Sequence, residues 1–437
     1  MTSSIIDAII ELLRHNPASS TELASFCGCD RSTITRQLKL LEAKLVTTGR
    51  ARATRYYLRR GADADTALYR VAETGNAELF GSLIAVMPHG YVVKTAGEAD
   101  DCFYDDLPWW LQDLRPQGFL GRNLAKALFS QGIVATDDID YWQDKDIFNA
   151  LLHAKGDSPG NLLLGSLSYQ QWLQHQPAMV SEADFVKLAT DAMAGEVVGS
   201  SAGGEQPKFC AFVDGTHRLV KFTEPATNAN SQRWADLLMA EHLALTTLAD
   251  FAIAATHSKI VKLGQRTFLS CERFDRVGAF GRKGLVSLRM VDMQFVGKPA
   301  EWPVIAQQLL QDKRITAQDA ATIAVVWCFG RLIANTDMHT GNLSFYFTND
   351  SGLTLASIYD MLPMAFAPLR SGAMASSHTF TITPVTEGKH WRQAYPMAEL
   401  FWRQLAAHAD ASAEFRAIAQ SMLLELQNKK QLIDRMA

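Results

Sequence analysis

A polar loop set between an apolar segment and a strand constrains the fold of this chain more than any other feature. Residues 334–345 read Ala-Asn-Thr-Asp-Met-His-Thr-Gly-Asn-Leu-Ser-Phe, which places Asp337 and Asn342 five residues apart. The segment before the loop, 322–333, has a helical apolar pattern, and a strand is predicted after it. Phosphoryl transfer needs a carboxylate that orients a hydroxyl and an oxygen ligand for Mg²⁺ close by. The loop therefore predicts Asp337 as a catalytic residue and Asn342 as a metal ligand.

A second acidic residue is predicted to return to this loop through a hairpin. A turn at 349–352 separates two strand-like runs, 343–347 and 353–358, and Asp360 follows the second run. The hairpin would bring Asp360 beside Asn342, where the two oxygens could hold Mg²⁺ against the phosphates of ATP. The alternative is that Asp360 caps a helix, because an apolar stretch follows it.

Upstream, a loop of small residues leads into a predicted strand pair. The loop covers 199–207 and runs into strands at 208–213 and 218–222, with an Asp-Gly turn between them. Small residues let backbone N–H groups approach a phosphate closely. No Gly-Lys-Ser/Thr sequence ends the loop, so it is not a Walker A motif. A glycine loop followed by a strand pair with a lysine, here Lys221, is the layout by which kinases cover nucleotide phosphates.

Lys221 needs a partner, because its ammonium is flanked by apolar residues within a strand. A bound phosphate would be one partner. Glu241, in the predicted helix 234–248, would be another, as in the lysine–glutamate pair of kinases. The alternative is a strand whose lysine simply points into water.

The run Glu-Arg-Phe-Asp-Arg at 272–276 leaves a predicted strand and becomes polar. In a two-lobed kinase the connection between the lobes offers main-chain groups to adenine, and a carboxylate there can reach ribose. Glu272, Phe274 and Asp275 suit these places. A surface cluster of ion pairs explains the same run equally well.

The first 60 residues carry a charge opposite to that of the remainder. They hold ten Lys or Arg and five Asp or Glu, a net +5, whereas the whole chain is −4 and the remainder is therefore −9. A basic head on an acidic body suggests a polyanionic partner for the head alone.

The head also has the pattern of a winged helix-turn-helix domain. Helices are predicted up to Asn16, from Ser20 to Phe26 and from Arg31 to Leu45, and a basic hairpin is predicted over 46–58. The third helix would reach bases and phosphates from its N-terminal part, and the hairpin would lie beside the phosphate backbone. The predicted DNA-binding residues are Arg31, Ser32, Thr33, Thr35 and Arg36 on the helix and Arg50, Arg52 and Arg55 on the hairpin. A three-helix packing module with a solvated basic face is the alternative.

Composition excludes several other classes. About half of the chain is apolar and a fifth is charged, which is typical of a globular protein. The uncharged stretch 320–330 is shorter than a membrane span, and the N-terminus lacks the basic start of a secretory signal. We therefore expect a cytoplasmic protein with no membrane contact.

The scattered cysteines do not predict a metal site. Cys27 and Cys29 are separated by one residue, which does not match zinc-ligand spacing, and six reduced thiols are expected. His339 has no second His or Cys at ligand spacing, so we do not expect it to bind zinc. We expect it to shape the loop, and general-base catalysis is the alternative.

From Ser200 onward the chain resembles the HipA family of bacterial toxin serine/threonine kinases. The resemblance rests on Ser-Ala-Gly-Gly-Glu-Gln-Pro-Lys at 201–208, Val-Lys-Phe at 220–222, Glu-Arg-Phe-Asp-Arg at 272–276, Asn-Thr-Asp-Met-His-Thr-Gly-Asn at 335–342 and Tyr-Asp-Met at 359–361. It spans most of residues 75–430. The usual HipA kinase lacks the basic head and borrows DNA binding from a separate antitoxin, HipB.

The resemblance implies a role for each motif. Lys221 would contact the ATP phosphates, the main chain of Glu272 and Phe274 would meet adenine, and Asp275 would meet ribose. Asp337 would be the catalytic aspartate. The residues implied to bind ATP are Ser201, Ala202, Gly203, Gly204, Lys221, Glu272, Phe274, Asp275, Asn342 and Asp360, with Asn342 and Asp360 as the Mg²⁺ ligands.

The family also phosphorylates a serine of its own glycine loop, which ejects the loop and switches the kinase off. Ser201 lies at the matching place when the loop is aligned on 206–208, and its neighbour Ser200 is a second candidate. The choice between the two serines stays open.

The expected fold is α+β: a two-lobed, protein-kinase-like HipA fold with a small N-terminal winged helix-turn-helix domain. We expect the winged domain at 1–60, the HipA N-terminal subdomain and kinase N-lobe at 61–275, and a mostly helical C-lobe at 276–437. Residues 60–65 look like a linker.

The predicted function is ATP- and Mg²⁺-dependent phosphorylation of a protein Ser or Thr, with DNA binding by the head. Family substrates imply an aminoacyl-tRNA synthetase or another translation factor as the target, and DNA binding implies association with the nucleoid. A homodimer fits, because winged domains often read two half-sites. A separate antitoxin is left open. The alternatives are a non-catalytic, nucleotide-sensing transcriptional regulator and a metabolite kinase.

Overall fold

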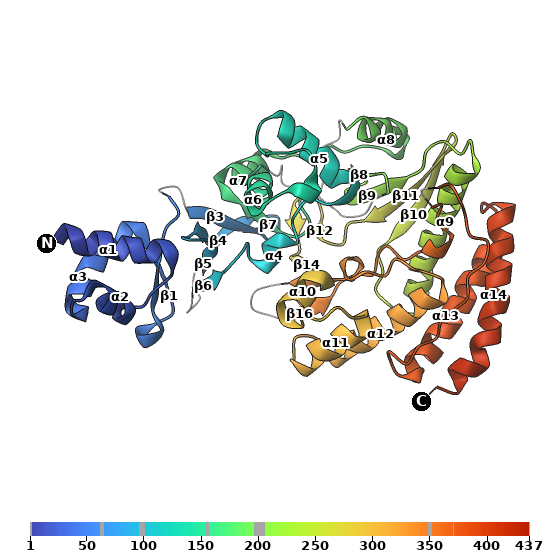
Figure 1. Cartoon of the computed structure of the whole chain (residues 1–437). Helices are drawn as coiled ribbons and strands as arrows, with labels where there is room; N and C mark the ends of the chain where they lie inside the picture. Colours follow the sequence, from blue (N-terminus) through green and yellow to red (C-terminus); the bar gives the residue numbers. More distant parts are fainter. Residues whose placement is uncertain are drawn as a thin grey trace.

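The computed structural model describes residues 2–61, 65–95, 101–153, 157–195, 206–347, 352–369 and 371–436. Along the chain come a small head, a middle region and a two-lobed body, and the head lies at one end of the molecule (Figure 1). None of the helices in these described ranges is long and apolar enough to cross a membrane.

The head has three helices followed by a two-stranded hairpin, as the sequence predicted. The elements are α1 (Thr2–His15), α2 (Ser20–Cys27), α3 (Arg31–Leu40), β1 (Leu45–Thr48) and β2 (Arg55–Leu58). Ser19 and Glu22 form a capping box at the start of α2, and Gly28 ends that helix in the left-handed conformation. Asp30 caps α3 by accepting a hydrogen bond from the Thr33 N–H at 2.9 Å.

The third helix ends five residues before the predicted Leu45. A 3₁₀ turn at Glu42–Lys44 follows it, and Leu45 begins β1, where it is buried opposite Leu58. The apolar repeat continues past the helix because the first residue of the strand packs into the same core. Periodicity alone therefore overestimated the length of this helix.

The middle region is an antiparallel sheet covered by helices. The strand order is β6-β5-β4-β3-β7. The strands are β3 (Asp65–Val71), β4 (Ala77–Ala85), β5 (Tyr91–Thr95), β6 (Cys102–Tyr104) and β7 (Leu162–Leu164), and the helices are α4 (Trp109–Gln112), α5 (Gly118–Ser130), α6 (Asp144–Leu152) and α7 (Gly165–Gln174). An apolar core between the sheet and the helices includes Leu83, Trp110 and Leu124.

The head is fastened directly to this sheet. Arg59 forms a β-bridge with Val86, and the Arg60 guanidinium donates to the carbonyls of Val86 and Gly90 at 2.9 and 3.1 Å. Tyr57 of the hairpin packs in an apolar cluster with residues of β4 and β5. Arg60 therefore belongs to the junction, and the prediction that a linker begins there was wrong, because its side chain is held by two carbonyls of the middle region.

The upper lobe of the body is a four-stranded antiparallel sheet in the order β10-β11-β9-β8. The strands are β8 (Lys208–Val213), β9 (Thr216–Phe222), β10 (Ser258–Leu263) and β11 (Arg266–Glu272). Helix α8 (Phe185–Ala194) packs on one face through Phe185, Phe209 and Phe268. The long helix α9 (Ala229–Asp250) contacts β11 and β10 and supplies apolar residues to the larger core below.

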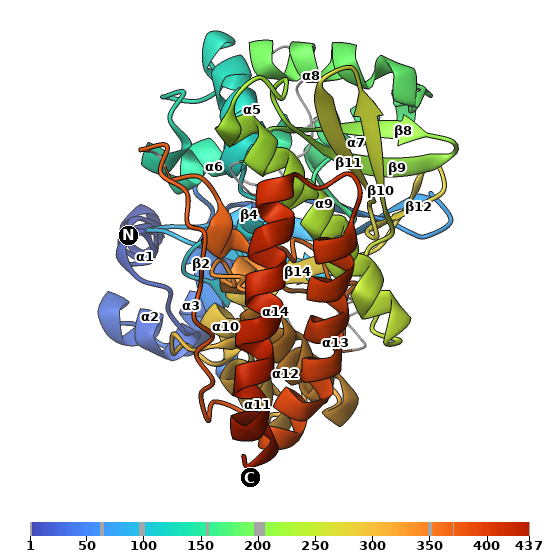
Figure 2. The ribbon, with the colours of Figure 1, turned by 90° about the vertical axis from the view of Figure 1, so that its right-hand side faces the viewer.

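The lower lobe is mainly helical. Figure 2 shows α13 and α14 side by side on its outer surface. Its helices are α10 (Leu288–Phe295), α11 (Trp302–Gln311), α12 (Ala317–Leu332), α13 (Gly388–Ala407) and α14 (Ala413–Asp434), and its small strands are β12 (Arg276–Val277), β13 (Gly281–Arg282), β14 (Leu285–Ser287), β15 (Ser344–Phe347) and β16 (Leu353–Leu355). The predicted pairing of the strands on either side of 349–352 is present, because β15 pairs with β16.

Candidate active site

The structure brings three predicted site residues from three distant segments into direct contact. The Lys221 ammonium, on β9, donates to both oxygens of Glu241, on α9, at 2.7 and 2.8 Å. It also donates to Oδ1 of Asp360 at 2.5 Å, 139 residues further along the chain. Lys221 and Glu241 are buried. The alternative in which the lysine points into water is therefore wrong.

The charges of this cluster are coupled. Burial disfavours the Lys221 ammonium, but Asp360 and Glu241 outweigh it and raise the lysine pKa. Burial would also raise the pKa of Asp360, yet the nearby Lys221 and Lys208 ammonium groups bring it below its ordinary value. Burial raises the pKa of Glu241, against the attraction of Lys221. Lys221 and Asp360 are therefore a charged pair at neutral pH.

Sequence reasoning missed Lys208, which belongs to the same cluster. It lies on β8 directly opposite Lys221 and is buried. Burial, followed by repulsion from Lys221, lowers its pKa to about 8. Its position right after the glycine loop was visible in the sequence. Its burial was not, because a strand lysine is expected to alternate outward.

The catalytic-loop candidates lie between α12 and β15. The Asp337 N–H donates to Oδ1 of the buried Asn335 at 3.0 Å, and the Asn342 side-chain NH₂ donates to the Asp337 carbonyl at 2.9 Å. These bonds fix the backbone of the loop and leave the Asp337 carboxylate exposed. Partial burial raises the pKa of Asp337, and the repulsion of Asp360 adds to this against the attraction of His339. An exposed carboxylate on a hydrogen-bonded loop can meet an incoming hydroxyl group.

His339 shapes this loop, as predicted. Its Nδ1 accepts a hydrogen bond from the Gly341 N–H at 3.0 Å, and its carbonyl accepts one from the Trp302 indole at 3.2 Å. The imidazole thus closes the 3₁₀ turn Thr340–Asn342.

A tyrosine joins the metal-ligand candidates. The Tyr359 hydroxyl donates to the Gly341 carbonyl at 2.8 Å and lies 2.8 Å from the Ser344 hydroxyl. Tyr359 precedes Asp360, and Gly341 precedes Asn342, so the bond brings these two segments together as the hairpin predicted. Asp360 itself has φ +54°, an uncommon conformation for a residue with a side chain.

Asp360 does not cap a helix. The next helical turn is the short 3₁₀ segment Met364–Phe366, and Pro363 stands at its N-cap. The alternative role considered for Asp360 is therefore wrong. Lys221 takes one carboxylate oxygen of Asp360, and the second accepts no hydrogen bond from the part of the chain that the structure describes, so it can serve as an oxygen ligand. Asn342 likewise donates through its NH₂ and keeps its carbonyl oxygen, so the two residues fit a hard cation such as Mg²⁺.

Gly330 is a second feature that sequence reasoning missed. A Cβ at this position of α12 would lie 2.4 Å from Sδ of Met338 and 3.2 Å from Sδ of Met361. The missing side chain lets both methionines, one from each active-site segment, pack against the same helix. A glycine within an apolar helical pattern was the signal available in the sequence.

In the connection between the lobes, the residues predicted to meet adenine and ribose already have partners within the protein. The Glu272 N–H donates to the His257 carbonyl at 2.8 Å, and the Glu272 carbonyl accepts a hydrogen bond from the Thr256 hydroxyl at 2.7 Å. Both main-chain groups of Glu272 therefore already have partners. Phe274 packs its ring against Tyr346 and Tyr359. Asp275 is buried and accepts hydrogen bonds from Arg273, Arg276 and the Gly160 N–H. The adenine and ribose roles stay predictions, and these contacts count against those of Glu272 and Asp275.

The glycine-loop candidates Ser200, Ser201, Ala202, Gly203 and Gly204 lie outside the described residues. Their roles in phosphate binding and autophosphorylation therefore remain sequence-based predictions. The described chain resumes at Gln206, directly before β8.

The predicted DNA-binding residues of the head are mostly exposed. Arg36 and Arg52 are exposed, whereas Ser32 and Thr33 bond to the Asp30 carboxylate and Thr35 bonds to the Arg31 carbonyl at 2.8 Å. Arg31 and Arg50 are also exposed.

Arg55 is tied to the rest of the head at the start of β2. It donates to the Pro17 carbonyl at 3.1 Å and lies 3.8 Å from Glu22. Its contacts brace the hairpin against α2.

Comparison with known proteins identifies the family. Residues 62–173 match the model of the YjjJ-like toxin middle domain, and residues 200–430 match that of the HipA-like C-terminal domain. The chain belongs to the HipA-like toxin family.

Within this family it is 40% identical to Toxin YjjJ of Escherichia coli strain K12, over 98% of this chain and 99% of that protein. HipA of Shewanella oneidensis MR-1, solved with HipB and its operator DNA, has the same fold at TM-score 0.58 and 14% identity. The match covers 84% of this chain and 98% of HipA. The proinflammatory kinase CtkA of Helicobacter pylori is 14% identical at TM-score 0.36, over 53% of this chain and 90% of that one.

Proposed function

We propose that this protein is an ATP- and Mg²⁺-dependent serine/threonine protein kinase of the HipA toxin type. The observation that carries the proposal is the contact of Lys221 with Glu241 and Asp360. A buried ammonium held by one helix carboxylate and one loop carboxylate, beside a loop with Asp337 and Asn342, is the charge arrangement that phosphoryl transfer uses.

In this proposal each residue has a separate task. Bound ATP and Mg²⁺ supply the phosphoryl group and neutralise its charge. Lys221 and Lys208 attract the phosphates, and Glu241 holds Lys221 in place. Asn342 and Asp360 provide oxygen ligands. Asp337 orients the substrate hydroxyl and accepts its proton, so that positioning and electrostatics lower the barrier.

The proposal extends to self-modification of the glycine loop. A serine there, Ser201 or its neighbour Ser200, would receive the phosphoryl group and switch the kinase off. Mass spectrometry of the purified protein, before and after incubation with ATP, tests this extension. Phosphate on either serine of the wild type and on neither serine of Asp337→Asn supports it. Loops without phosphate in both proteins contradict it.

We also propose that the head binds DNA as a winged helix-turn-helix domain. Its net charge of +5, its three helices and hairpin, and exposed Arg36 and Arg52 support this reading. HipA of Shewanella oneidensis was solved together with HipB and operator DNA. A fused head would let this toxin occupy its own promoter without borrowing such a partner.

The decisive experiment is phosphoryl transfer from γ-labelled ATP to the protein itself and to a translation-factor panel that includes aminoacyl-tRNA synthetases. Label on the wild type and its loss in Asp337→Asn support a kinase. The matched control is Asp137→Asn, which changes an exposed aspartate of the middle region. Nucleotide binding with no transfer under any divalent cation would instead support the nucleotide-sensing regulator.

A further inference from the structure

The middle region contacts the kinase-like body at the connection between its two lobes, residues 272–287, which runs from the end of β11 to the start of α10. Asp275 lies in this connection, and its carboxylate accepts bonds from Arg273 at 3.1 and 3.0 Å and from Arg276 at 2.6 Å. The fourth donor comes from the middle region, because the Gly160 N–H reaches the same carboxylate at 2.9 Å. Arg273, Asp275 and Arg276 are thus held in part by a segment more than a hundred residues away.

The middle region also contributes a charge to this network. Asp157 accepts from Arg273 at 2.5 Å and from Arg276 at 3.3 Å. Arg276 additionally donates to the carbonyls of Ser158 and Gly160 at 2.7 and 3.0 Å. Asp157 and Asp275 attract Arg273 and Arg276, and the buried Arg282 adds a third positive group, so the charges of this network depend on one another.

A second attachment lies on the other side of the connection. Asp113, which follows α4 of the middle region, accepts bonds from the Ser287 N–H and hydroxyl, both at 2.6 Å. Ser287 ends β14 and is the N-cap of α10, and the next residue, Leu288, donates its N–H to the Leu343 carbonyl at 2.8 Å. Leu343 directly follows Asn342, so two hydrogen-bonded contacts, from Ser287 to Asp113 and from Leu288 to Leu343, connect Asp113 to the candidate catalytic loop.

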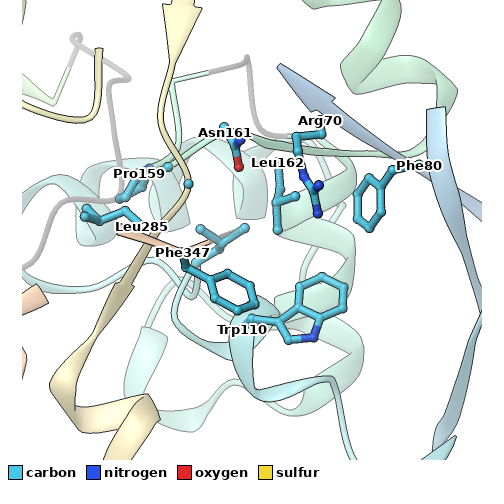
Figure 3. A pocket seen from close by; sticks show the side chains of 11 residues that line it. Arg70, Phe80, Trp110, Pro159, Asn161, Leu162, Leu285 and Phe347 are labelled. Carbon is cyan, nitrogen blue, oxygen red and sulfur yellow. The ribbon is translucent and has the colours of Figure 1, made fainter. Parts of the chain in front are cut away.

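A closely packed seam joins the two attachments. Figure 3 shows Pro159, Asn161 and Trp110 of the middle region facing Leu285 and Phe347 of the lower lobe. The space left between them is about 10 Å³, enough for a single water molecule. The seam therefore leaves no room for a ligand between these residues.

We propose that Asp157 and Asp113 are positioning residues of the kinase: they fasten the middle region to both ends of the interlobe connection and set the orientation in which Lys221 meets Asp360. Asp157 acts on the upper end through Arg273 and Arg276. Asp113 acts on the lower end through Ser287. The expected effect on catalysis rests on the proposed kinase function, whereas the attachment of the middle region to the connection does not.

The test uses Asp157→Asn and Asp113→Asn in the full-length protein, with Asp137→Asn as the matched control. Asp157→Asn is expected to weaken ATP binding about fivefold or more, because the connection beside the nucleotide loses its support. Asp113→Asn is expected to lower kcat about tenfold while the dissociation constant of ATP stays within about twofold. Unchanged kcat and ATP affinity in both variants, with an active wild type, would overturn the inference and leave the kinase function standing.

Hydrogen exchange separates this inference from the kinase function, because it needs no catalysis. Asp157→Asn should raise exchange at 273–276 and Asp113→Asn at 287–290 and 342–344, relative to the control. If the wild type proves inactive and these segments still exchange faster, the kinase proposal fails and the fastening holds. If exchange is unchanged, the fastening is wrong.

Two further variants cover the case in which an asparagine variant does not fold. Arg276→Lys keeps the charge but cannot span Asp157 and both carbonyls, and Ser287→Ala removes the hydroxyl donor to Asp113. Each should shift the same readout as its partner variant, by a smaller factor. No shift in folded Arg276→Lys and Ser287→Ala would count against the inference.

Discussion

Lys208 and Lys221 lie directly opposite each other on neighbouring strands, and both amines are buried. Two ammonium groups this close resist sharing full charge without anionic partners. Lys221 has Glu241 and Asp360 at hydrogen-bond distance, and the pKa of Lys208 is lowered to about 8 by burial and by repulsion from Lys221, against the attraction of Asp360 and Glu241. Near and above pH 8 the Lys208 amine is therefore partly neutral, and it can take up a proton when a phosphate binds.

ATP binding near pH 8 should therefore be coupled to proton uptake by Lys208. At that pH the lysine is roughly half protonated, and triphosphate favours the ammonium, so about half a proton is taken up. Calorimetry in buffers of different ionisation enthalpy measures the uptake. Lys208→Met should abolish it, whereas Lys259→Met, on the edge strand β10, should not. Equal uptake in both variants would contradict the assignment.

The same lysine gives a stability profile with a defined sign. Its folded pKa lies below the ordinary 10.5, so between about pH 8 and 10.5 the unfolded chain binds more protons. The contribution of Lys208 to the free energy of unfolding of the ATP-free protein should therefore rise with pH through this window. Denaturant unfolding of wild type and Lys208→Met compares the slopes. If the free energy of unfolding of the wild type falls more steeply with pH than that of the variant, the sign is opposite to the prediction.

Replacing Glu241 by Gln should affect stability as well as activity. The change leaves Lys221 with one carboxylate, Asp360, which then neutralises it fully and competes with metal binding. Removing one partner of a buried pair costs about 3–5 kcal/mol, and the remaining Asp360 should reduce this loss. Thermal unfolding and kcat are the measurements. The exposed pair Lys430–Asp434 supplies the control, because Asp434→Asn should change unfolding by less than about 1 kcal/mol.

Gly330→Ala should displace Met338 and Met361 and thereby disturb the candidate site. The added methyl would lie 2.6 Å from Cε of Met338, next to Asp337, and 3.2 Å from Sδ of Met361, next to Asp360. Overpacking of this kind costs about 1–3 kcal/mol. We expect a lower kcat with little change in the dissociation constant of ATP. Gly132→Ala tests the general cost, because a Cβ there meets nothing within 4 Å although its φ of +69° adds local strain.

Proton transfer should give activity an acid limb that reflects Asp337. Its pKa is raised by partial burial, so the carboxylate protonates at a higher pH than an ordinary aspartate. The kcat should be maximal above the pKa of Asp337 and should fall as the pH decreases through that pKa. The pH profile of kcat measures the limb. His339→Ala should raise the midpoint further, since the histidine lowers the Asp337 pKa; a lower midpoint would be inconsistent.

DNA binding by the head should depend steeply on salt. Arg36→Ala or Arg52→Ala should weaken binding to duplex DNA of any sequence and reduce the slope of log K against log salt by about 1 each, if each contacts a phosphate. Fluorescence anisotropy at several salt concentrations measures this. Lys126→Ala, exposed on α5 of the middle region, is the control. Equal slopes of log K against log salt in all of these proteins would contradict the proposal that the head contacts DNA.

The sequence predicted those parts of the site that local pattern encodes. Lys221, Glu241 and Asp360 could be assigned because the strand, helix and hairpin that carry them follow the kinase layout, and Lys221 and Asp360 also lie in HipA-like motifs. Asp157 could not be linked to Arg273, because no local pattern relates residues more than a hundred positions apart. The burial of Asp275 was missed for the same reason. Leu45 was assigned to a helix because one apolar repeat serves helix and strand in the same core.

The central claim is that Lys221, Asn342 and Asp360 converge on one triphosphate. A crystal structure with a non-hydrolysable ATP analogue and Mg²⁺ tests it most directly. We predict that Asn342 and Asp360 bind the metal at about 2.0–2.1 Å and that Lys221 contacts phosphate oxygens. A nucleotide bound elsewhere, or an Asp360 that still faces only Lys221 while the metal sits on other ligands, would contradict the claim.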